Sequence, residues 1–186
     1  NDPYVLETQK RGYKSRAAFK LLQIDEKYKF LAPGLAVIDL GCAPGGWLQI
    51  ASQKVSSIVG KEKVVGVDLL PTEDIPGSIS IIGDISDRII GEKLIQIIGT
   101  KPNIIMSDMA ANTTGHRQTD HIRTTFLLET ALDFAIENLK KNGVFLAKCF
   151  KGGAEIEALS LMRKHFSKVN HIKPDASRKE SVEGYV

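Results

Sequence analysis

The chain has 186 residues, of which 42% are hydrophobic and 25% are charged. This balance predicts one folded domain over residues 1–186 and excludes a disordered chain. No apolar run reaches the roughly 18 residues that a membrane-spanning helix needs, and no signal peptide is visible. We therefore expect an intracellular protein with no membrane partner. The two cysteines, Cys42 and Cys149, are too few for a disulfide framework or a zinc site, and their apolar surroundings predict buried thiols.

The net charge of +3 is unevenly distributed along the chain. Residues 1–30 hold seven Lys and Arg against four Asp and Glu, and residues 163–186 hold six against three. The middle holds twelve against fifteen, so two basic ends flank an acidic centre. This pattern is typical of solvated terminal helices or of a protein that binds a polyanion through both ends. Charge alone leaves both interpretations open.

Apolar runs and amphipathic stretches alternate along the chain. Ser15 is the expected N-cap of a helix that continues to Ile24. Further helices are expected over residues 47–56, 87–98, 120–140 and 154–166. Strands are expected over residues 35–39, 63–67, 78–82, 103–106, 143–150, 168–173 and 182–186. The chain begins at Asn1 and stops within the last expected strand, so we expect further protein beyond both ends.

Alternating strands and helices predict an α/β protein with a mostly parallel, doubly wound sheet and helices on both faces. Such sheets bind ligands outside the carboxyl ends of their strands. Four acidic residues end or follow the first four expected strands: Asp39, Asp68, Asp84 and Asp108. Although aspartate is common in turns, this repeated placement predicts a ligand site at that edge of the sheet.

The first strand leads into the turn Asp39-Leu-Gly-Cys-Ala-Pro-Gly-Gly-Trp47. Glycines at such a place let the backbone approach a ligand closely. The dinucleotide pattern G-x-G-x-x-G is absent, and a phosphate-binding Walker motif would need Lys where Trp47 stands. The turn therefore disfavours a pyrophosphate site, and with it an NAD-dependent oxidoreductase.

The pattern D-x-G-x-x-P-G-G is similar to the first motif of class I S-adenosylmethionine-dependent methyltransferases. Four more segments follow the same family order: Lys14–Leu21, Asp68–Pro71, Ser107–Asn112 and the stretch from Pro174 to Tyr185. With them the chain resembles, over residues 8–186, the FtsJ-like (RrmJ-type) ribosomal RNA 2′-O-ribose methyltransferases. The resemblance implies a Rossmann-like methyltransferase fold with a seven-stranded sheet and an antiparallel last strand. It departs from the family pattern at Ala111, Lys151 and Gly184.

The resemblance also implies S-adenosylmethionine as the cofactor. An acidic cleft suits this molecule because it carries a sulfonium and an ammonium but no phosphate. Asp68 is expected to accept hydrogen bonds from the ribose hydroxyls of the cofactor. Asp84 is expected to accept a hydrogen bond from the adenine amino group, with Leu69 and Ile85 as apolar walls. The implied cofactor-binding set is Gly41, Gly45, Gly46, Trp47, Asp68, Leu69, Asp84, Ile85 and Asp108.

The family uses a Lys-Asp-Lys-Glu tetrad, matched here by Lys20, Asp108, Lys148 and Glu183. Lys148 stands out on its own, because an unpaired charge in an apolar strand is costly. We expect Lys148 to accept the proton of the ribose hydroxyl, with its pKa lowered by burial and by Lys20. Asp108 would orient Lys148, and Glu183 would hold one lysine. The alternatives are a solvated helix lysine at Lys20 and a helix cap at Asp108.

The basic ends are the expected RNA-binding surface, with residues 1–30 forming part of it. Its proposed contacts are Lys10, Arg11, Lys14, Arg16, Arg178 and Lys179, with Arg117, Arg123 and Lys151 at the rim. We expect methyl transfer to a ribose 2′-hydroxyl of RNA, most simply a uridine of large-subunit ribosomal RNA. The alternatives are a tRNA or mRNA-cap substrate and a non-catalytic ribosome assembly factor. We expect a monomer without a metal, and the sequence does not distinguish cytoplasm, nucleolus and organelle.

Overall fold

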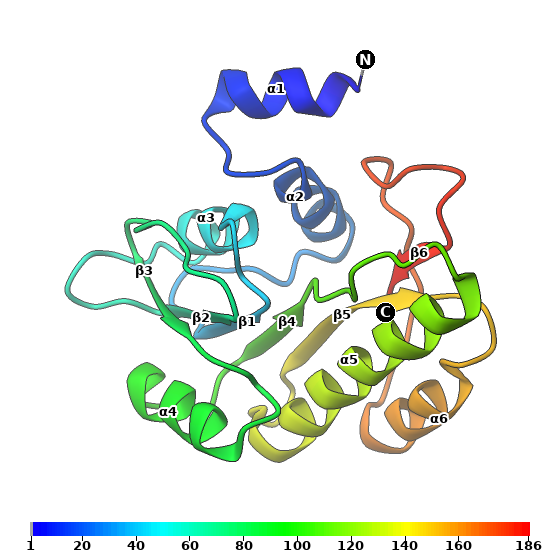
Figure 1. Ribbon diagram of the computed structural model, residues 1–186. Helices are drawn as coiled ribbons and strands as arrows, with labels where there is room; N and C mark the ends of the chain where they lie inside the picture. Colours follow the sequence, from blue (N-terminus) through cyan, green and yellow to red (C-terminus); the bar gives the residue numbers. More distant parts are fainter. Residues whose placement is uncertain (1) are drawn as a thin grey trace.

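A six-stranded sheet runs through the middle of the computed structural model, which describes residues 2–186 (Figure 1). Its strands are β1 (Val37–Leu40), β2 (Val64–Asp68), β3 (Ser78–Ile82), β4 (Ile104–Ser107), β5 (Val144–Phe150) and β6 (Glu183–Tyr185). Their order in the sheet is β3-β2-β1-β4-β5-β6. The first five strands are parallel, and β6 runs antiparallel to β5. The predicted α/β fold with an antiparallel last strand is confirmed.

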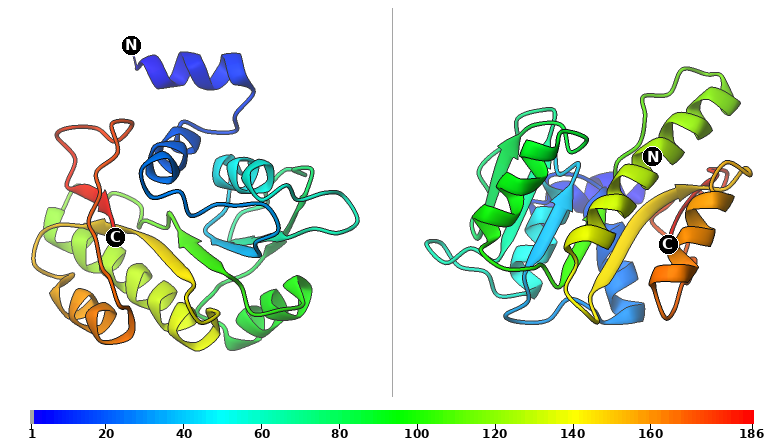
Figure 2. Two further views of the ribbon diagram at one scale, coloured as in Figure 1. Left: turned by 180° about the vertical axis from the view of Figure 1, so that it is seen from behind. Right: turned by 90° about the horizontal axis from the view of Figure 1, so that it is seen from below.

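Helices cover both faces of the sheet (Figures 1 and 2). One face carries α2 (Ala17–Tyr28) and α3 (Gly46–Lys54), and the other carries α4 (Arg88–Ile98), α5 (Arg117–Asn138) and α6 (Ile156–His165). Alternate residues of β1 show the reason, since Val37 packs toward α2 and α3 while Ile38 packs toward α4 and α5. Strands buried on both faces must be apolar along their whole length, which is why they were legible in the sequence.

The N-terminal segment forms a helix that the sequence analysis did not predict, α1 (Pro3–Arg11). It lies beyond α2, away from the sheet, and buries none of its residues (Figure 1). Without a core-facing stripe it gives little periodic signal, but its caps are readable. The Asp2 carboxylate accepts a hydrogen bond from the amide of Tyr4, and Pro3 occupies the first turn.

The prediction of Ser15 as the N-cap of the next helix is wrong. α2 starts after Arg16, which makes no side-chain capping bond. Ser15 instead lies against the turn that follows β1, where a Cβ on Gly46 would come within 2.5 Å of its hydroxyl. Ser15 thus helps to hold the start of α2 against that turn.

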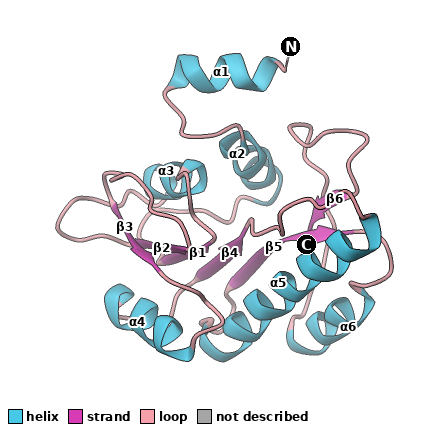
Figure 3. Ribbon diagram, viewed as in Figure 1, coloured by secondary structure: helices cyan, strands magenta, loops and turns pink. Residues whose placement is uncertain are grey.

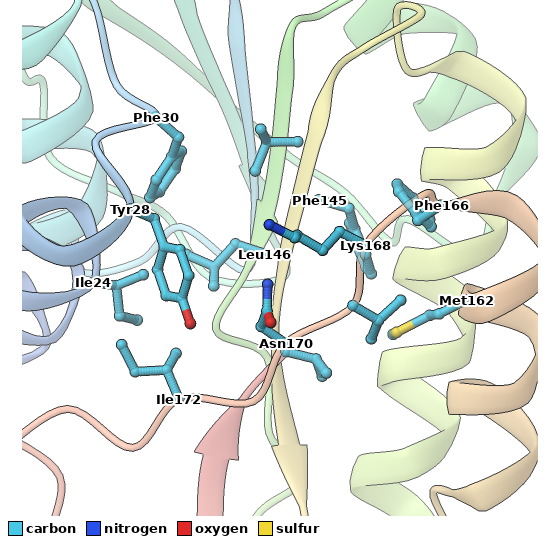
Figure 4. Close-up of a pocket in the computed structure, with 13 residues that line it drawn as sticks. Ile24, Tyr28, Phe30, Phe145, Leu146, Met162, Phe166, Lys168, Asn170 and Ile172 are labelled. Carbon is cyan, nitrogen blue, oxygen red and sulfur yellow. The ribbon is translucent and has the colours of Figure 1, made fainter.

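The expected seventh strand, over residues 168–173, is also wrong for the part of the chain that the structure describes. Its only ladder contact is an isolated bridge between Ile172 and Tyr185. Residues 168–170 border an apolar cavity of about 250 Å³, across which lie Phe145 and Leu146 of β5 (Figure 4). The cavity lies between these residues and β5, so within residues 2–186 they form no ladder with that strand.

The strand order determines at which edge of the sheet a ligand site can form. β1 lies between β2 and β4, so the chain leaves it toward both sides and a crevice opens between the carboxyl ends of β1 and β4. The long loops after β2 and β4 start at this edge (Figure 3). Within residues 2–186 no helix has the length and apolarity to cross a bilayer, and no cluster of His, Cys, Asp or Glu is arranged to hold a metal ion.

Replacing Leu21 with Ala is expected to lower the free energy of unfolding by about 2–5 kcal/mol. Leu21 is fully buried between α2 and the sheet, so its loss leaves a cavity under the helix. Leu6→Ala on α1 is the control, because Leu6 is 62% exposed. Urea denaturation measures both, and equal losses for the two variants would contradict this packing.

Candidate active site

Four charged side chains meet at the carboxyl ends of β4 and β5. The Lys20 Nζ atom lies 2.6 Å from Glu183 Oε1. The Lys148 Nζ atom lies 3.2 Å from Asp108 Oδ1 and 3.4 Å from Glu183 Oε2. The predicted tetrad is therefore one continuous chain of ion pairs, in the order Lys20, Glu183, Lys148, Asp108.

Each member of this tetrad comes from a different element. Lys20 is on α2, Asp108 follows β4, Lys148 is on β5 and Glu183 is the first residue of β6. The antiparallel register sets Lys148 opposite Tyr185 and leaves Glu183 two residues away on the same face. Both lysines are buried, with 8% and 9% of their surface exposed, so neither is a solvated surface lysine.

Tyr185 is a fifth member of the site, and the sequence analysis missed it. Its hydroxyl lies 2.5 Å from Asp108 Oδ1 and 3.2 Å from Glu183 Oε1, and its ring packs against Trp47. Burial between two carboxylates raises the pKa of Tyr185 well above its usual value, so the hydroxyl stays protonated and donates. The spacing could have indicated Tyr185, because it is two residues after Glu183 and residues two apart on a strand share a face.

The expectation that the pKa of Lys148 is lowered is not met in this structure. Burial lowers the pKa of its ammonium, but Asp108 and Glu183 oppose that effect and leave the pKa above its usual value. Burial likewise raises the pKa of Glu183, and the two lysines reverse the shift and lower it. Lys148 is therefore a protonated ammonium held by two carboxylates.

A cavity of about 360 Å³ opens beside this tetrad, and Asp108 belongs to both. Three carboxylates line it, from Asp68, Asp84 and Asp108, and its lining contains no Lys, Arg or His. Its walls are largely apolar, and they include Leu69, Ile85, Met109, Phe126 and Leu127. Such a cavity suits a cationic ligand with flat apolar parts and disfavours a pyrophosphate.

Backbone and side-chain donors fix the orientation of two of these carboxylates. The two oxygens of Asp68 accept hydrogen bonds from the amides of Ala43 and Leu70, both at 2.9 Å. One oxygen of Asp84 accepts from the amide and hydroxyl of Ser86, which lower the pKa of Asp84. The remaining lone pairs of both carboxylates are available to a ligand.

The residues of the glycine turn after β1 lie in two places, some at the cavity and others in the core. Gly41 lines the cavity with φ +76°, and a Cβ there would come within 2.4 Å of Met109 Cγ. Gly45, Gly46 and Trp47 are not among the lining residues. The Trp47 indole is buried and donates to the carbonyl of Ala17, which ties the turn to the helix that carries Lys20.

Two residues differ from what the sequence suggested about this edge. Asp39 lies inside β1 rather than at its end, is fully buried, and neither carboxylate oxygen has a hydrogen-bond partner within residues 2–186. Burial, with the nearby charges of Asp108 and Asp68, raises the pKa of Asp39 well above its usual value. Phe126, an apolar residue of the helix expected over residues 120–140, is 60% exposed and lines the cavity instead of packing in the core.

The N-terminal helices α1 and α2 and the loop that follows residue 174 lie on one side of the molecule (Figure 1). The Arg16 guanidinium donates to the carbonyl of Ala176, and the Ala176 amide donates to Gln23, so α2 holds the loop that carries Arg178 and Lys179. Most of the predicted N-terminal RNA contacts are engaged within the protein. Arg11 pairs with Glu7, Lys14 with Glu73 and Arg16 with Asp2. The exposed cations without an ion pair among residues 2–186 include Lys10, Arg178 and Lys179.

Comparison with known proteins gives concordant results. The sequence model of the FtsJ-like methyltransferase family matches residues 13–186. A ribosomal RNA large subunit methyltransferase E of Bartonella tribocorum is 53% identical over 186 residues, which is 100% of this chain and 77% of that protein. The protein of the same name from Mesorhizobium japonicum is 51% identical over 100% of this chain and 70% of its own length. The crystal structure of a Plasmodium falciparum protein assigned as a ribosomal RNA methyltransferase matches with a TM-score of 0.80 and 27% identity, over 93% of this chain and 95% of that one.

Replacing Asp39 with Asn is expected to stabilise the protein at neutral pH. A folded-state pKa above 3.8 means that the folded protein holds a proton that the unfolded chain releases, so wild-type stability falls as the pH rises above about 4. The Asn variant cannot lose that stability. Its advantage in the free energy of unfolding should therefore be small near pH 4 and grow toward pH 7.

Urea denaturation at several pH values measures this difference, with Asp133→Asn on the exposed side of α5 as the control. An advantage that shrinks as the pH rises would show that Asp39 is a stabilising, ionised group.

Proposed function

The chain belongs to the FtsJ-like methyltransferase family, and we propose that it transfers a methyl group from S-adenosylmethionine to a ribose 2′-hydroxyl of large-subunit ribosomal RNA. One observation carries the proposal. Asp108 lines the acidic cavity and also ends the ion-pair chain through Lys148, so a ligand site and a proton-handling site share one side chain.

The cavity fits the proposed cofactor by its chemistry. When bound, S-adenosylmethionine supplies a methyl group attached to a positively charged sulfur. Asp68 and Asp84 have lone pairs free to accept hydroxyl and amino protons, and Leu69 and Ile85 give apolar walls. Three carboxylates without a lining cation complement a positive ligand and repel a phosphate, which also argues against NAD.

In this proposal, Lys148 Nζ accepts the proton of the ribose hydroxyl. This group is protonated while both Asp108 and Glu183 face it, so it must lose a proton before it can act as a base. Of the two carboxylates, Asp108 is the one that lines the cavity, and a positive charge bound there weakens its hold on the ammonium. Lys20 pairs with the other oxygen of Glu183 and helps to hold that carboxylate in place. The positive charge at Asp108 thus moves the pKa of Lys148 toward the working range of a base.

The same observations bear on the alternative functions, an assembly factor and a tRNA or mRNA-cap methyltransferase. A non-catalytic assembly factor has no need for two buried lysines on one carboxylate, an arrangement that costs desolvation. A tRNA or an mRNA cap would use the same tetrad chemistry. The names of the relatives favour ribosomal RNA, because both proteins cited above are ribosomal RNA large subunit methyltransferases.

Replacing Lys148 with Ala is expected to lower the rate of methyl transfer by about 10²- to 10⁴-fold, the usual contribution of a positioned base. Cofactor affinity should change little, because Lys148 does not line the cavity. Transfer of labelled methyl to unmodified large ribosomal subunits measures the first quantity, and calorimetry with S-adenosylmethionine measures the second. Lys141→Ala, at an exposed position, is the control. Near-normal turnover of the Lys148 variant would remove Lys148 from the chemistry.

Replacing Asp68 with Asn is expected to weaken S-adenosylmethionine binding by about 10- to 100-fold, since hydrogen bonds to a charged group contribute roughly 1.5–3 kcal/mol. Asp74→Asn is the control, because Asp74 is exposed and outside the cavity lining. Calorimetry with S-adenosylmethionine and, separately, with NAD measures the affinities. Tighter binding of NAD by the wild-type protein would contradict the assignment of the cavity.

A further inference from the structure

We propose that a second cavity, between the start of α5 and the turn after β5, binds a backbone phosphate of the RNA next to the nucleotide that is methylated. This inference rests on the proposed function. The cavity has a volume of about 550 Å³. Its lining residues are Arg117, Gln118, His121, Ile122, Gly152 and Ala154.

The cavity is close to the tetrad along the chain. Lys148 lies on β5, Phe150 ends that strand, and Gly152 follows two residues later. The rings of Phe150 and His121 are 5.6 Å apart in an edge-to-face arrangement, which fixes the start of α5 against the end of β5. A phosphate in the second cavity would thus lie beside the turn that follows the strand carrying the proposed base.

His121 is a polar side chain buried at this cavity without a partner. It is 8% exposed, and its Nε2 atom is buried with no hydrogen-bond partner within residues 2–186. A Cβ on residue 152 would come within 2.1 Å of its Nδ1 atom, so only glycine leaves room for the imidazole. A buried polar group without a partner is costly, and its presence in a cavity lining points to a ligand.

The electrostatics of the cavity favour an anion. Arg117 is exposed, belongs to no ion pair among residues 2–186, and occupies the first turn of a 22-residue helix. The acids of the adjoining segments, Asp120 and Glu155, are not among the residues that line the cavity. Their carboxylates are turned to their own loops: Asp120 accepts hydrogen bonds from the amide and hydroxyl of Thr114, and Glu155 accepts from the amides of Gly152 and Gly153.

The lining distinguishes a phosphate from a base. Single-stranded bases are held mainly by stacking on aromatic rings, and no aromatic ring other than the imidazole lines this cavity. Arg117, Gln118 and His121 offer donors of the kind that a phosphodiester accepts. The site therefore positions the RNA strand without reading its sequence.

Arg117→Ala tests the proposal, with Arg163→Ala as a control that removes the same charge from an exposed position at the far end of α6. Methylation of unmodified large-subunit ribosomal RNA should show KM raised about five- to tenfold in the Arg117 variant and kcat within twofold of wild type. The slope of log affinity against log salt concentration should become shallower by about one contact. Gly152→Ala, which displaces His121, should raise KM in the same way while Arg117 is still present.

Three results would count against the phosphate site. If Arg117→Ala and Arg163→Ala behave alike, the effect is one of net charge and the site is absent. If Arg117→Ala weakens binding of inorganic phosphate and leaves RNA affinity unchanged, the cavity serves a free ion. If the wild-type protein methylates no RNA, the proposed function fails and this inference fails with it, whereas the first two results leave that function intact.

Discussion

Two buried lysines share one carboxylate, and the geometry of the active site depends on that shared pairing. Lys20 and Lys148 each face an oxygen of Glu183, and both are buried, where an ammonium without a partner would be costly. The pairing requires α2, β5 and β6 to meet at one point, so the antiparallel register of β6 is a condition for the site. Asp108 and Tyr185 complete the network, and Asp108 connects it to the acidic cavity.

The acidic cavity and the basic ends of the chain have opposite charge, and each suits a different kind of ligand. The carboxylates at the strand ends create a site for a cation, while unpaired cations on the periphery attract a polyanion. Much of the N-terminal basic charge is paired internally, as at Arg11 and Arg16. Under the proposed function, we therefore expect the free cations at the start of α5 and in the loop after residue 174 to contribute more to RNA binding than their number suggests.

Much of this arrangement could be predicted from the sequence, and the exceptions have identifiable causes. Buried parallel strands were legible as apolar runs, and the tetrad was legible from its family motifs. The helix α1 was missed because it buries no residue. The strand expected over residues 168–173 does not form, because within residues 2–186 only Ile172 makes a bridge, to Tyr185. The charge state of Lys148 depends on distances to two carboxylates from other elements, which no local pattern contains. Tyr185 and the cavity-lining role of Phe126 depend on the same kind of tertiary contact.

The central claim is that this site acts on a ribose hydroxyl. The most direct test is mass spectrometry of the nucleosides released from large-subunit ribosomal RNA after treatment with the protein and isotope-labelled S-adenosylmethionine. The account predicts that the label appears on the ribose 2′-oxygen of a single nucleotide. Label on a base nitrogen or carbon would contradict it, because the lysine network would then have a role other than the removal of a hydroxyl proton.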